Sequence, residues 1–184
     1  METLALARAL VGVVIVRDAP EGRAAGRIVE TEAYPIGDPA CHAYAGKTRR
    51  NASLFGPPHL AYVYQIYGTS FCFNLASEAE GSGAGVLVRA LEPLEGLDLM
   101  RARRFGARDL CRGPGRLCAA LAIDRSHDGC SLFDGGAVWL ARGRPPLRVR
   151  TSRRIGIARA AERRLRFYEA GNPFVSGPRF LSPP

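Results

Sequence analysis

The segment GRIVETEAYPIGDPACH (26–42) combines a β-strand pattern with the polar groups that an enzyme site needs. With a period of two, Glu30, Glu32 and Tyr34 share one face of the strand, and Val29 and Ala33 lie on the other. One face can pack into a core while the other shows two carboxylates and a ring to a cleft. The pattern also fits an amphipathic strand with two solvated acids, so this segment alone leaves both interpretations open.

Length and composition predict one folded domain that occupies residues 1–184. The chain is 47% hydrophobic and 23% charged, which is typical of a globular domain that can bury a core without disulfides or metals. Its five cysteines are an odd number and contain no CxxC spacing, so we expect reduced thiols, no metal site and no cofactor.

No run of about 18 apolar residues occurs, so we expect no membrane span. The apolar stretch 1–16 is interrupted by Glu2 and Arg8 and lacks a cleavage signal, so we do not expect a signal peptide either. The expected location is the cytoplasm, in association with the nucleoid.

The formal net charge is +9, and Lys47 is the single lysine, so arginine supplies nearly all of the positive charge. A polyanionic partner is one explanation, because guanidinium groups match phosphates well. An arginine bias that reflects genomic base composition is the other, and charge alone does not separate the two.

Hydrophobic periodicity predicts mostly strands with helices inserted between them. Helices are expected at 2–10, at 93–104 and after the Gly113-Pro114-Gly115-Arg116 turn, with a further short helix possible at 108–112; strands are expected at 11–16, 27–34, 60–67, 71–77, 85–91, 137–142, 147–157 and 165–168. The stretch 18–25 reads as a turn and the tail from Gly171 as irregular. Runs of strands without strict βαβ alternation predict a single α+β domain.

The segment 60–77 predicts a β-hairpin whose first arm carries three tyrosines. Tyr62, Tyr64 and Ile66 share one face, and Tyr67 lies near the tip on the other. An aromatic at the tip could enter a minor groove and displace a base, and the rings on the other face could stack on it. Tyrosine is also simply favoured in strands.

Other polar residues in these elements have both a structural and a functional interpretation. Asn74 can hydrogen-bond a ligand or the sheet, and Arg89 inside an apolar strand needs an anionic or carbonyl partner. The 113–116 turn can present amide groups and Arg116 to a phosphate, or it can be an ordinary helix start. His42 lies in a loop, where most single histidines have no ligand.

Together these stretches resemble the alkyladenine (3-methyladenine) DNA glycosylase family of base-excision repair. The resemblance runs in order through the segments 26–51, 62–74, 85–96, 100–104, 108–124, 154–157 and 166–176. It implies a single domain with a curved, mostly antiparallel sheet, surrounding helices and a protruding hairpin, similar to the C-terminal domain of a tRNA formyltransferase. It also implies a monomer that acts on double-stranded DNA containing damaged purines.

The resemblance assigns roles to the catalytic and pocket residues. Glu32 would be the base that activates water, and Arg89 would help to position it. Tyr34, His42, Tyr64 and Asn74 would form the pocket for a flipped base, with Asn74 rejecting guanine through its 2-amino group. Glu30 is left as a structural acid.

The resemblance also assigns the contacts with the duplex. Tyr67 would fill the gap left in the duplex by the flipped base. Phosphate contacts would come from Lys47, Arg50, Gly115 and Arg116.

The expected reaction is hydrolysis of the N-glycosidic bond of 3-methyladenine, 7-methylguanine, hypoxanthine or ethenoadenine, which leaves an abasic site. A lyase mechanism with an amine nucleophile is not expected, because Lys47 is the only lysine and the chain has no N-terminal proline. The alternative function is a non-catalytic nucleic-acid-binding protein that has the same fold.

Overall fold

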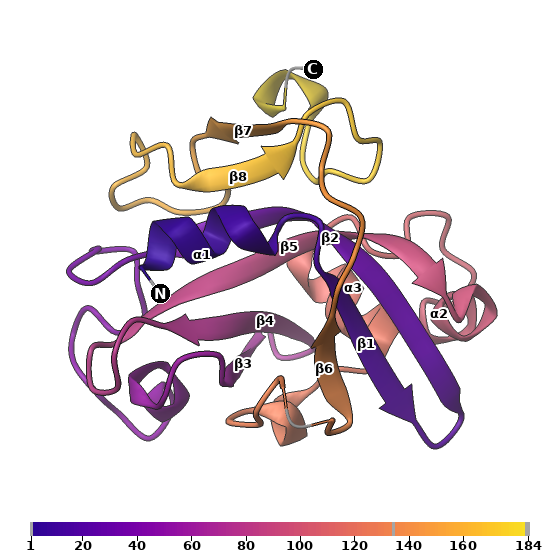
Figure 1. Ribbon diagram of the computed structural model, residues 1–184, viewed down its shortest axis with the longest axis horizontal. Helices are drawn as coiled ribbons and strands as arrows, with labels where there is room; N and C mark the ends of the chain where they lie inside the picture. The colour runs from indigo at the N-terminus through magenta and orange to yellow at the C-terminus, as the bar shows by residue number, and fades with distance from the viewer. Residues whose placement is uncertain (1, 134, 183–184) are drawn as a thin grey trace.

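The long strand β2 (Gly22–Tyr34) organises an eight-stranded antiparallel sheet in the computed structural model (Figure 1). The structure describes residues 2–133 and 135–182, so both ends of the expected domain, residues 1 and 184, lie outside the described residues. The strand order is β3–β4–β5–β2–β1–β6, and β8 pairs with β2 and β7. The predicted α+β single domain with a curved antiparallel sheet is confirmed.

Most of the expected elements are present, and their bounds are as follows. The helices are α1 (Thr3–Leu10), α2 (Leu97–Arg103) and α3 (Pro114–Leu121), with short 3-10 turns at Ala52–Phe55, Arg125–His127 and Arg179–Leu181. The other strands are β1 (Val14–Ala19), β3 (Ala61–Ile66), β4 (Ser70–Ser77), β5 (Ala84–Glu95), β6 (Val138–Ala141), β7 (Val149–Ser152) and β8 (Arg166–Glu169). None of the helices within the described residues is long and apolar enough to span a bilayer.

Several predictions of local structure are wrong. The stretch 18–25 is a tight hairpin between β1 and β2, in which Ala19 pairs with Gly22. Strand β5 continues through Pro93 to Glu95, so α2 starts four residues later than expected. Residues 108–112 are not helical, and the strand expected at 147–157 is confined to β7. In the first two cases, pairing with β2 overrides the local turn and helix signals.

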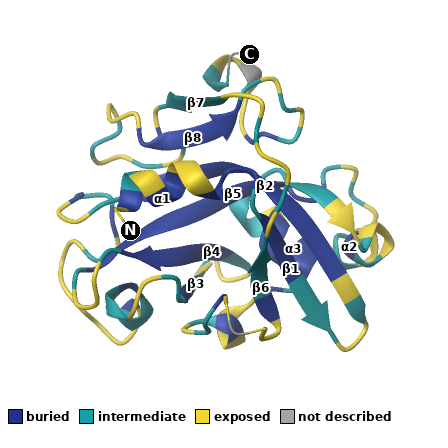
Figure 2. Cartoon of the chain, in the orientation of Figure 1, coloured by how far each residue is buried: buried dark blue, intermediate teal, exposed yellow. Residues whose placement is uncertain are grey.

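Strand β2 changes its neighbour halfway along one edge. Its first half pairs with β1, and its second half pairs with β8 from Glu30 to Glu32, while β5 follows the opposite edge. The β7–β8 pair therefore forms a branch of the sheet above α1 in Figure 1. β8 pairs with the edge of the second half, Ser176 in the segment after it hydrogen-bonds Glu30, and β2 is buried from Ala24 to Ala33 (Figure 2). Of the two interpretations that the sequence leaves open, the amphipathic strand with two solvated acids is therefore excluded.

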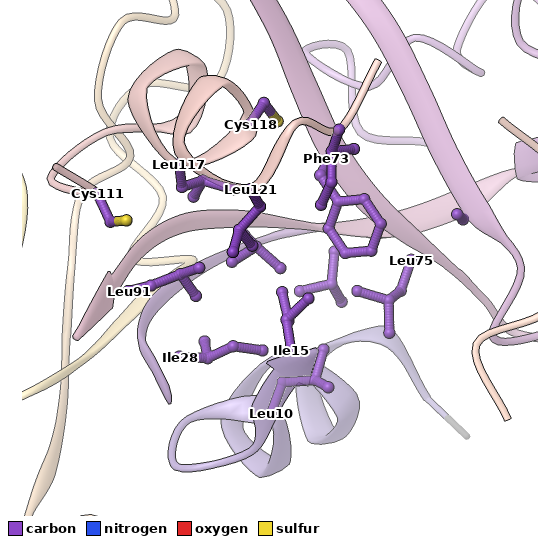
Figure 3. Close-up of a cluster of buried hydrophobic side chains, with 14 of the residues drawn as sticks. Leu10, Ile15, Ile28, Phe73, Leu75, Leu91, Cys111, Leu117, Cys118 and Leu121 are labelled. Atoms are coloured by element: carbon purple, nitrogen blue, oxygen red, sulfur yellow. The ribbon is translucent and has the colours of Figure 1, made fainter. Parts of the chain in front are cut away.

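The main core lies where α1 and α3 pack against the sheet. Figure 3 shows Leu10 of α1 and Leu121 of α3 on either side of Ile15, Ile28 and the other apolar side chains that the strands contribute. Leu10, Leu121, Ile15 and Ile28 are each at most 4% exposed, and each contributes roughly 1.5–3 kcal/mol of burial free energy. This core holds β2, β4 and β5 in register and thereby fixes the polar side chains at their ends.

Candidate active site

A cavity of about 340 Å³ opens where the ends of β2 and β5 meet the β3–β4 hairpin. Its wall contains the predicted pocket residues Tyr34, His42, Tyr64 and Asn74, together with Arg89 and Tyr67. The structure thus brings six of the predicted site residues to one cavity. Its remaining wall comes from side chains with no predicted role, chiefly Tyr62, Leu54, Cys72, Leu87, Pro114 and residues 155–157.

Glu32 lies behind the cavity wall and is fully buried. Its Oε2 accepts a hydrogen bond from the Tyr34 hydroxyl at 2.8 Å, and its Oε1 accepts one from the backbone N–H of Ile155 at 2.7 Å. Nη1 of Arg89 lies 3.3 Å from the same Oε1. Since Tyr34, Arg89 and Ile155 all line the cavity, Glu32 is separated from it by a single layer of groups.

Burial raises the pKa of Glu32 above its ordinary value. Arg89, the Ile155 N–H and the Tyr34 hydroxyl oppose this rise by stabilising the carboxylate. Burial also raises the pKa of Tyr34, with the Glu32 carboxylate adding to the effect, so the phenol stays protonated and remains a donor. A dry carboxylate with a raised pKa is the property expected of a general base.

Arg89 links Glu32 to the second carboxylate, Glu30. Its Nε donates to Glu30 Oε1 at 3.0 Å, and Arg166 donates to the same oxygen at 2.5 Å. Glu30 also accepts two hydrogen bonds from Ser176, at 2.6 Å to the backbone N–H and 2.9 Å to the hydroxyl. Burial lowers the pKa of Arg89, but the Glu32 and Glu30 carboxylates outweigh this effect and the net pKa is raised. Arg89 therefore remains charged between the two acids.

The ring of Tyr34 is supported from behind by Arg154. The guanidinium carbon lies 4.6 Å from the ring centroid, which is within cation–π range. Arg154 donates to the Ala33 carbonyl at 3.0 Å and is ion-paired with the buried Asp38 at 2.8 Å. Asp38 belongs to the loop that follows β2, so this pair ties the segment around residue 154 to the end of the strand.

Three aromatic side chains, those of His42, Tyr62 and Tyr64, form another part of the cavity wall. His42 Nδ1 lies 2.9 Å from the Tyr62 hydroxyl, and the His42 and Tyr64 ring centroids are 4.4 Å apart. Burial raises the pKa of Tyr62 to about 12, and partial burial lowers the pKa of His42, which remains an exposed residue. Arg50 lowers the His42 pKa further. The imidazole is therefore neutral at pH 7 and offers one N–H.

Asn74 and Cys72 come from the return strand of the hairpin. Asn74 Nδ2 donates to the Tyr62 carbonyl at 3.0 Å across the β3–β4 pair. This contact fixes the side-chain amide against the strand while it lines the cavity. Burial raises the pKa of the Cys72 thiol, so the sulfur is a small neutral group in the wall.

Asn51 shapes the loop that carries His42. It is 4% exposed, and its Nδ2 donates to the carbonyls of His42 and Gly46 at 2.9 and 3.0 Å. Its Oδ1 accepts hydrogen bonds from the Thr48 backbone and hydroxyl at 2.6 and 3.0 Å. One buried side chain thus satisfies four backbone or side-chain groups of a loop that has no helix or strand.

Comparison with known proteins gives one consistent result. The family model for methylpurine-DNA glycosylase matches residues 1–173. A protein of Mesorhizobium japonicum, provisionally named a 3-methyladenine DNA glycosylase, is 55% identical over 98% of this chain and 88% of its own length. Relatives with the same provisional name occur in Paraburkholderia phytofirmans, at 50% identity over 98% of this chain and 86% of their own, and in Methanoculleus marisnigri, at 47% over 95% and 94%.

The chain belongs to the methylpurine-DNA glycosylase family. The resemblance inferred from the sequence motifs is therefore confirmed, and so is the expectation of a DNA glycosylase, a hydrolase of N-glycosyl bonds.

The hairpin of this glycosylase ends in an exposed aromatic tip. Tyr67 and Gly68 both have positive φ, 50° and 71°, which is the pattern of a type I′ turn. Tyr67 is 92% exposed, and Gln65 Nε2 donates to the Gly68 carbonyl at 2.6 Å. Tyr67 therefore belongs to the turn rather than to the strand, in contrast to the predicted 60–67 strand.

Three of the four residues expected to contact phosphates, Arg50, Gly115 and Arg116, lie near this tip. Lys47 and Arg50 are exposed in the loop after His42, and Arg50 donates to the Gln65 carbonyl at 3.1 Å. Gly115 lies in the first turn of α3 beside Ser70, where an added Cβ would come within 3.1 Å of the Ser70 Cβ. Arg116 is exposed and ion-paired with Asp109 at 3.2 Å.

Several residues that shape the glycosylase cavity had no role predicted for them. The period of two placed Tyr62 beside Tyr64 among the rings that could stack on a base, but the family resemblance assigned it no role. Ile155 and Arg154 lie in the RIGI segment (154–157), which carried part of the family resemblance without a role. Asn51 gave no local signal, because a buried loop asparagine and an exposed one look alike in sequence.

Proposed function

We propose that this protein flips alkylated or deaminated purines out of duplex DNA and hydrolyses their N-glycosidic bond with a water that Glu32 activates. The observation that carries the proposal is the buried Glu32 carboxylate directly behind an aromatic cavity, with Arg89 between them. The substrates are 3-methyladenine, 7-methylguanine, hypoxanthine and ethenoadenine, and the product is an abasic site.

The cavity suits a flipped purine. A base can stack on the ring of Tyr34, which has Arg154 against one face, and on the rings of the His42–Tyr64 pair. Such stacking contributes roughly 1–3 kcal/mol of binding free energy per base. A cationic alkylated purine is electron-poor and is attracted further to the ring faces. This stacking offsets the few kcal/mol that flipping costs, a cost that is least for a damaged or mispaired base.

The water would be held at the edge of the cavity by Glu32, Arg89 and the Ile155 carbonyl. Arg89 Nη1 lies 3.3 Å from Glu32 Oε1 and 3.4 Å from the Ile155 carbonyl oxygen, and both contacts are long. A water that moves in between Arg89 and these two oxygens would replace only these two long contacts. Glu32 would accept a proton from the water as it attacks, and its negative charge would stabilise the developing sugar cation.

Discrimination among purines follows from the groups that point into the cavity. Asn74 is fixed by Tyr62, so it would clash with the 2-amino group of any guanine and would reject unmodified guanine. 7-Methylguanine would be accepted despite this clash, because its positive charge strengthens stacking on the rings and makes it a better leaving group. Neutral His42 would donate one N–H to the base. Neutral lesions such as hypoxanthine need such hydrogen bonds because they are poorer leaving groups than cationic ones.

The duplex would lie across Tyr67, which fills the gap left by the flipped base, with Lys47, Arg50, Gly115 and Arg116 at the phosphates. Double-stranded DNA with a damaged purine is thus the proposed partner, the active species is a monomer, and repair of chromosomal DNA places the protein on the nucleoid.

The direct test uses duplexes that carry a single 7-methylguanine, hypoxanthine or ethenoadenine, followed by alkaline cleavage of abasic sites. Strand cleavage with wild-type protein and its loss with Glu32→Gln are the expected results. Lesion binding without product from any duplex would instead favour the non-catalytic alternative. Size-exclusion chromatography with light scattering tests the monomer.

A further inference from the structure

A second aromatic residue is presented in the same way as Tyr67. Phe105 is 99% exposed and has φ 52°, and Gly106 after it has φ 76°; the corresponding values for Tyr67 and Gly68 are 92%, 50° and 71°. Among the described residues, these two are the most exposed large hydrophobic side chains and the only exposed ones with positive φ. The chain thus builds the same aromatic–glycine turn twice, on a hairpin and at a helix end.

The backbone around Phe105 is well ordered by hydrogen bonds. The Phe105 N–H donates to the Ala102 carbonyl at 3.1 Å, and the Gly106 N–H donates to the Arg101 carbonyl at 2.8 Å. This is the Schellman arrangement at the end of α2, in which the left-handed position is usually glycine. Phenylalanine there is unfavourable for the backbone and buries nothing within the described protein. Folding alone therefore does not account for it.

Both aromatic residues line one groove, which we name the tip groove. It has a volume of about 600 Å³ and lies between the hairpin tip and the ends of α2 and α3. The groove and the base cavity share Ile66, Tyr67 and Pro114, so they lie on two sides of the Tyr67 tip. Arginines outnumber acids in its wall: Arg103, Arg104 and Arg116 against Asp124. Arg103 and Arg116 are ion-paired with Glu21 and Asp109, at 2.6 and 3.2 Å, and Asp124 is hydrogen-bonded to Ser126.

We propose that Phe105 is a second aromatic contact with DNA. The tip groove receives the part of the duplex on the side of Tyr67 away from the base cavity, and the Phe105 ring packs against the sugars and base edges exposed there. The inference rests on the proposed function, since it places the same duplex across Tyr67. Continuity with the base cavity, the positive wall and the unfavourable backbone position of an exposed phenylalanine together favour DNA as the occupant.

The first experiment measures binding to a duplex with a stable abasic-site analogue by fluorescence anisotropy. Phe105→Gly should weaken binding about tenfold, while Phe105→Trp should bind within about twofold of wild type. Because glycine is preferred at this helix end, Phe105→Gly should melt no lower than wild type, so weaker binding cannot be ascribed to unfolding. Phe180→Ala, which removes an exposed phenylalanine outside the groove, is the matched control and should bind normally.

The second experiment shortens the duplex to a few base pairs on one flank of the lesion or on the other. Wild type should lose the Phe105 contribution on one flank only, and Phe105→Gly should lose less affinity than wild type when that flank is shortened. Equal binding by wild type and Phe105→Gly on full-length duplex would overturn the proposal. Excision by the wild-type protein tests the proposed function separately. If the wild type excises lesions and Phe105→Gly binds as tightly as wild type, only the Phe105 contact is overturned. If binding depends on Phe105 but the wild type excises no lesion, only the glycosylase mechanism is overturned.

Discussion

The guanidinium carbon of Arg154 lies 4.6 Å from the centroid of the Tyr34 ring, and a 2.8 Å ion pair holds Arg154 to the buried Asp38. One face of the ring is therefore occupied by protein. Tyr34 cannot tilt away when a base stacks on its other face, because its hydroxyl is also fixed by Glu32. A cation, a ring and a carboxylate thus form one rigid unit at the end of β2.

This unit predicts a large difference between two arginines that both pair with Asp38. Arg154→Met leaves a buried carboxylate with an incomplete partner set, so unfolding free energy should fall by about 3–5 kcal/mol. Arg163→Met removes a 3.2 Å pair whose arginine is 42% exposed, and the loss should stay below about 1 kcal/mol. Urea denaturation of both variants gives the comparison, and equal losses would contradict a supporting role for Arg154.

The two acids of β2 should have separable effects. Glu32→Gln should keep lesion binding and slow single-turnover excision at least about a hundredfold, because it removes the general base. Glu30→Gln replaces with a neutral amide the carboxylate that accepts hydrogen bonds from Arg89, Arg166 and Ser176. It should therefore mainly lower the melting temperature. Excision by Glu32→Gln within about tenfold of wild type would place the base elsewhere.

The raised pKa of Glu32 predicts the direction of the pH dependence. Excision requires the carboxylate, so its rate should fall as pH drops through a value above 4.5, the ordinary pKa. The pKa of Glu32 is higher in the folded protein than in the unfolded chain, so protonated Glu32 favours the folded state. This contribution to the free energy of unfolding is complete below the pKa of the unfolded chain and is lost as pH rises through the pKa of the folded protein. The stability of Glu32→Gln relative to wild type should therefore increase from pH 4.5 upward. Rate profiles and chemical denaturation at several pH values measure the two effects, and a midpoint below 4.5 would contradict the assignment.

Asn51 should be as important to the cavity as the residues in its wall. Asn51→Ala removes the donors to His42 and Gly46 and the acceptor for Thr48, so the loop loses its internal support. We expect faster hydrogen exchange in residues 42–48 and a fall in kcat/KM of about tenfold, which corresponds to about 1.4 kcal/mol. Thr48→Ala, which keeps the backbone bond to Asn51, is the control and should change both readouts much less.

The absence of a side chain at Gly115 allows α3 to lie close to the hairpin, and we expect DNA binding to depend on this close approach. Gly115→Ala would place a Cβ 3.1 Å from the Ser70 Cβ, so the tip must shift and DNA binding should weaken. Adding Ser70→Gly removes the opposing atoms and should restore binding. Gly136→Ala, at an open position without positive φ, is the control. Failure of the double variant to recover would show that the amide geometry of α3, and not contact with the hairpin, matters.

The local sequence pattern was sufficient to predict a site residue where the direction of its side chain is set by the strand that carries it. The period of two placed Tyr62, Tyr64 and Ile66 on one face, and all three line the cavity. The motif match separated Glu32 from Glu30, and the two acids have different partners in the structure; their roles remain a prediction.

Local pattern was insufficient where distant segments meet. Nothing near Glu32 in sequence indicates that the Ile155 N–H will reach it, or that Ser176 will close over Glu30. For the same reason the burial of β2 does not follow from its own pattern, since its partner strand β8 lies more than 130 residues away. The exposure of Phe105 does not follow from local pattern either, because an aromatic residue after a helix is typical of a core unless the turn geometry is known.

The change of neighbour along β2 has a consequence for the order of synthesis. Glu30 and Glu32 leave the ribosome early, but the N–H groups that hold them come from Ser176 and Ile155, near the end of the chain. Before residues 155 and 176 take their places, neither acid has the N–H partner that it has in the folded protein. We therefore expect the arrangement around Glu30 and Glu32 to form late in folding, after residues 154–176 have packed against β2.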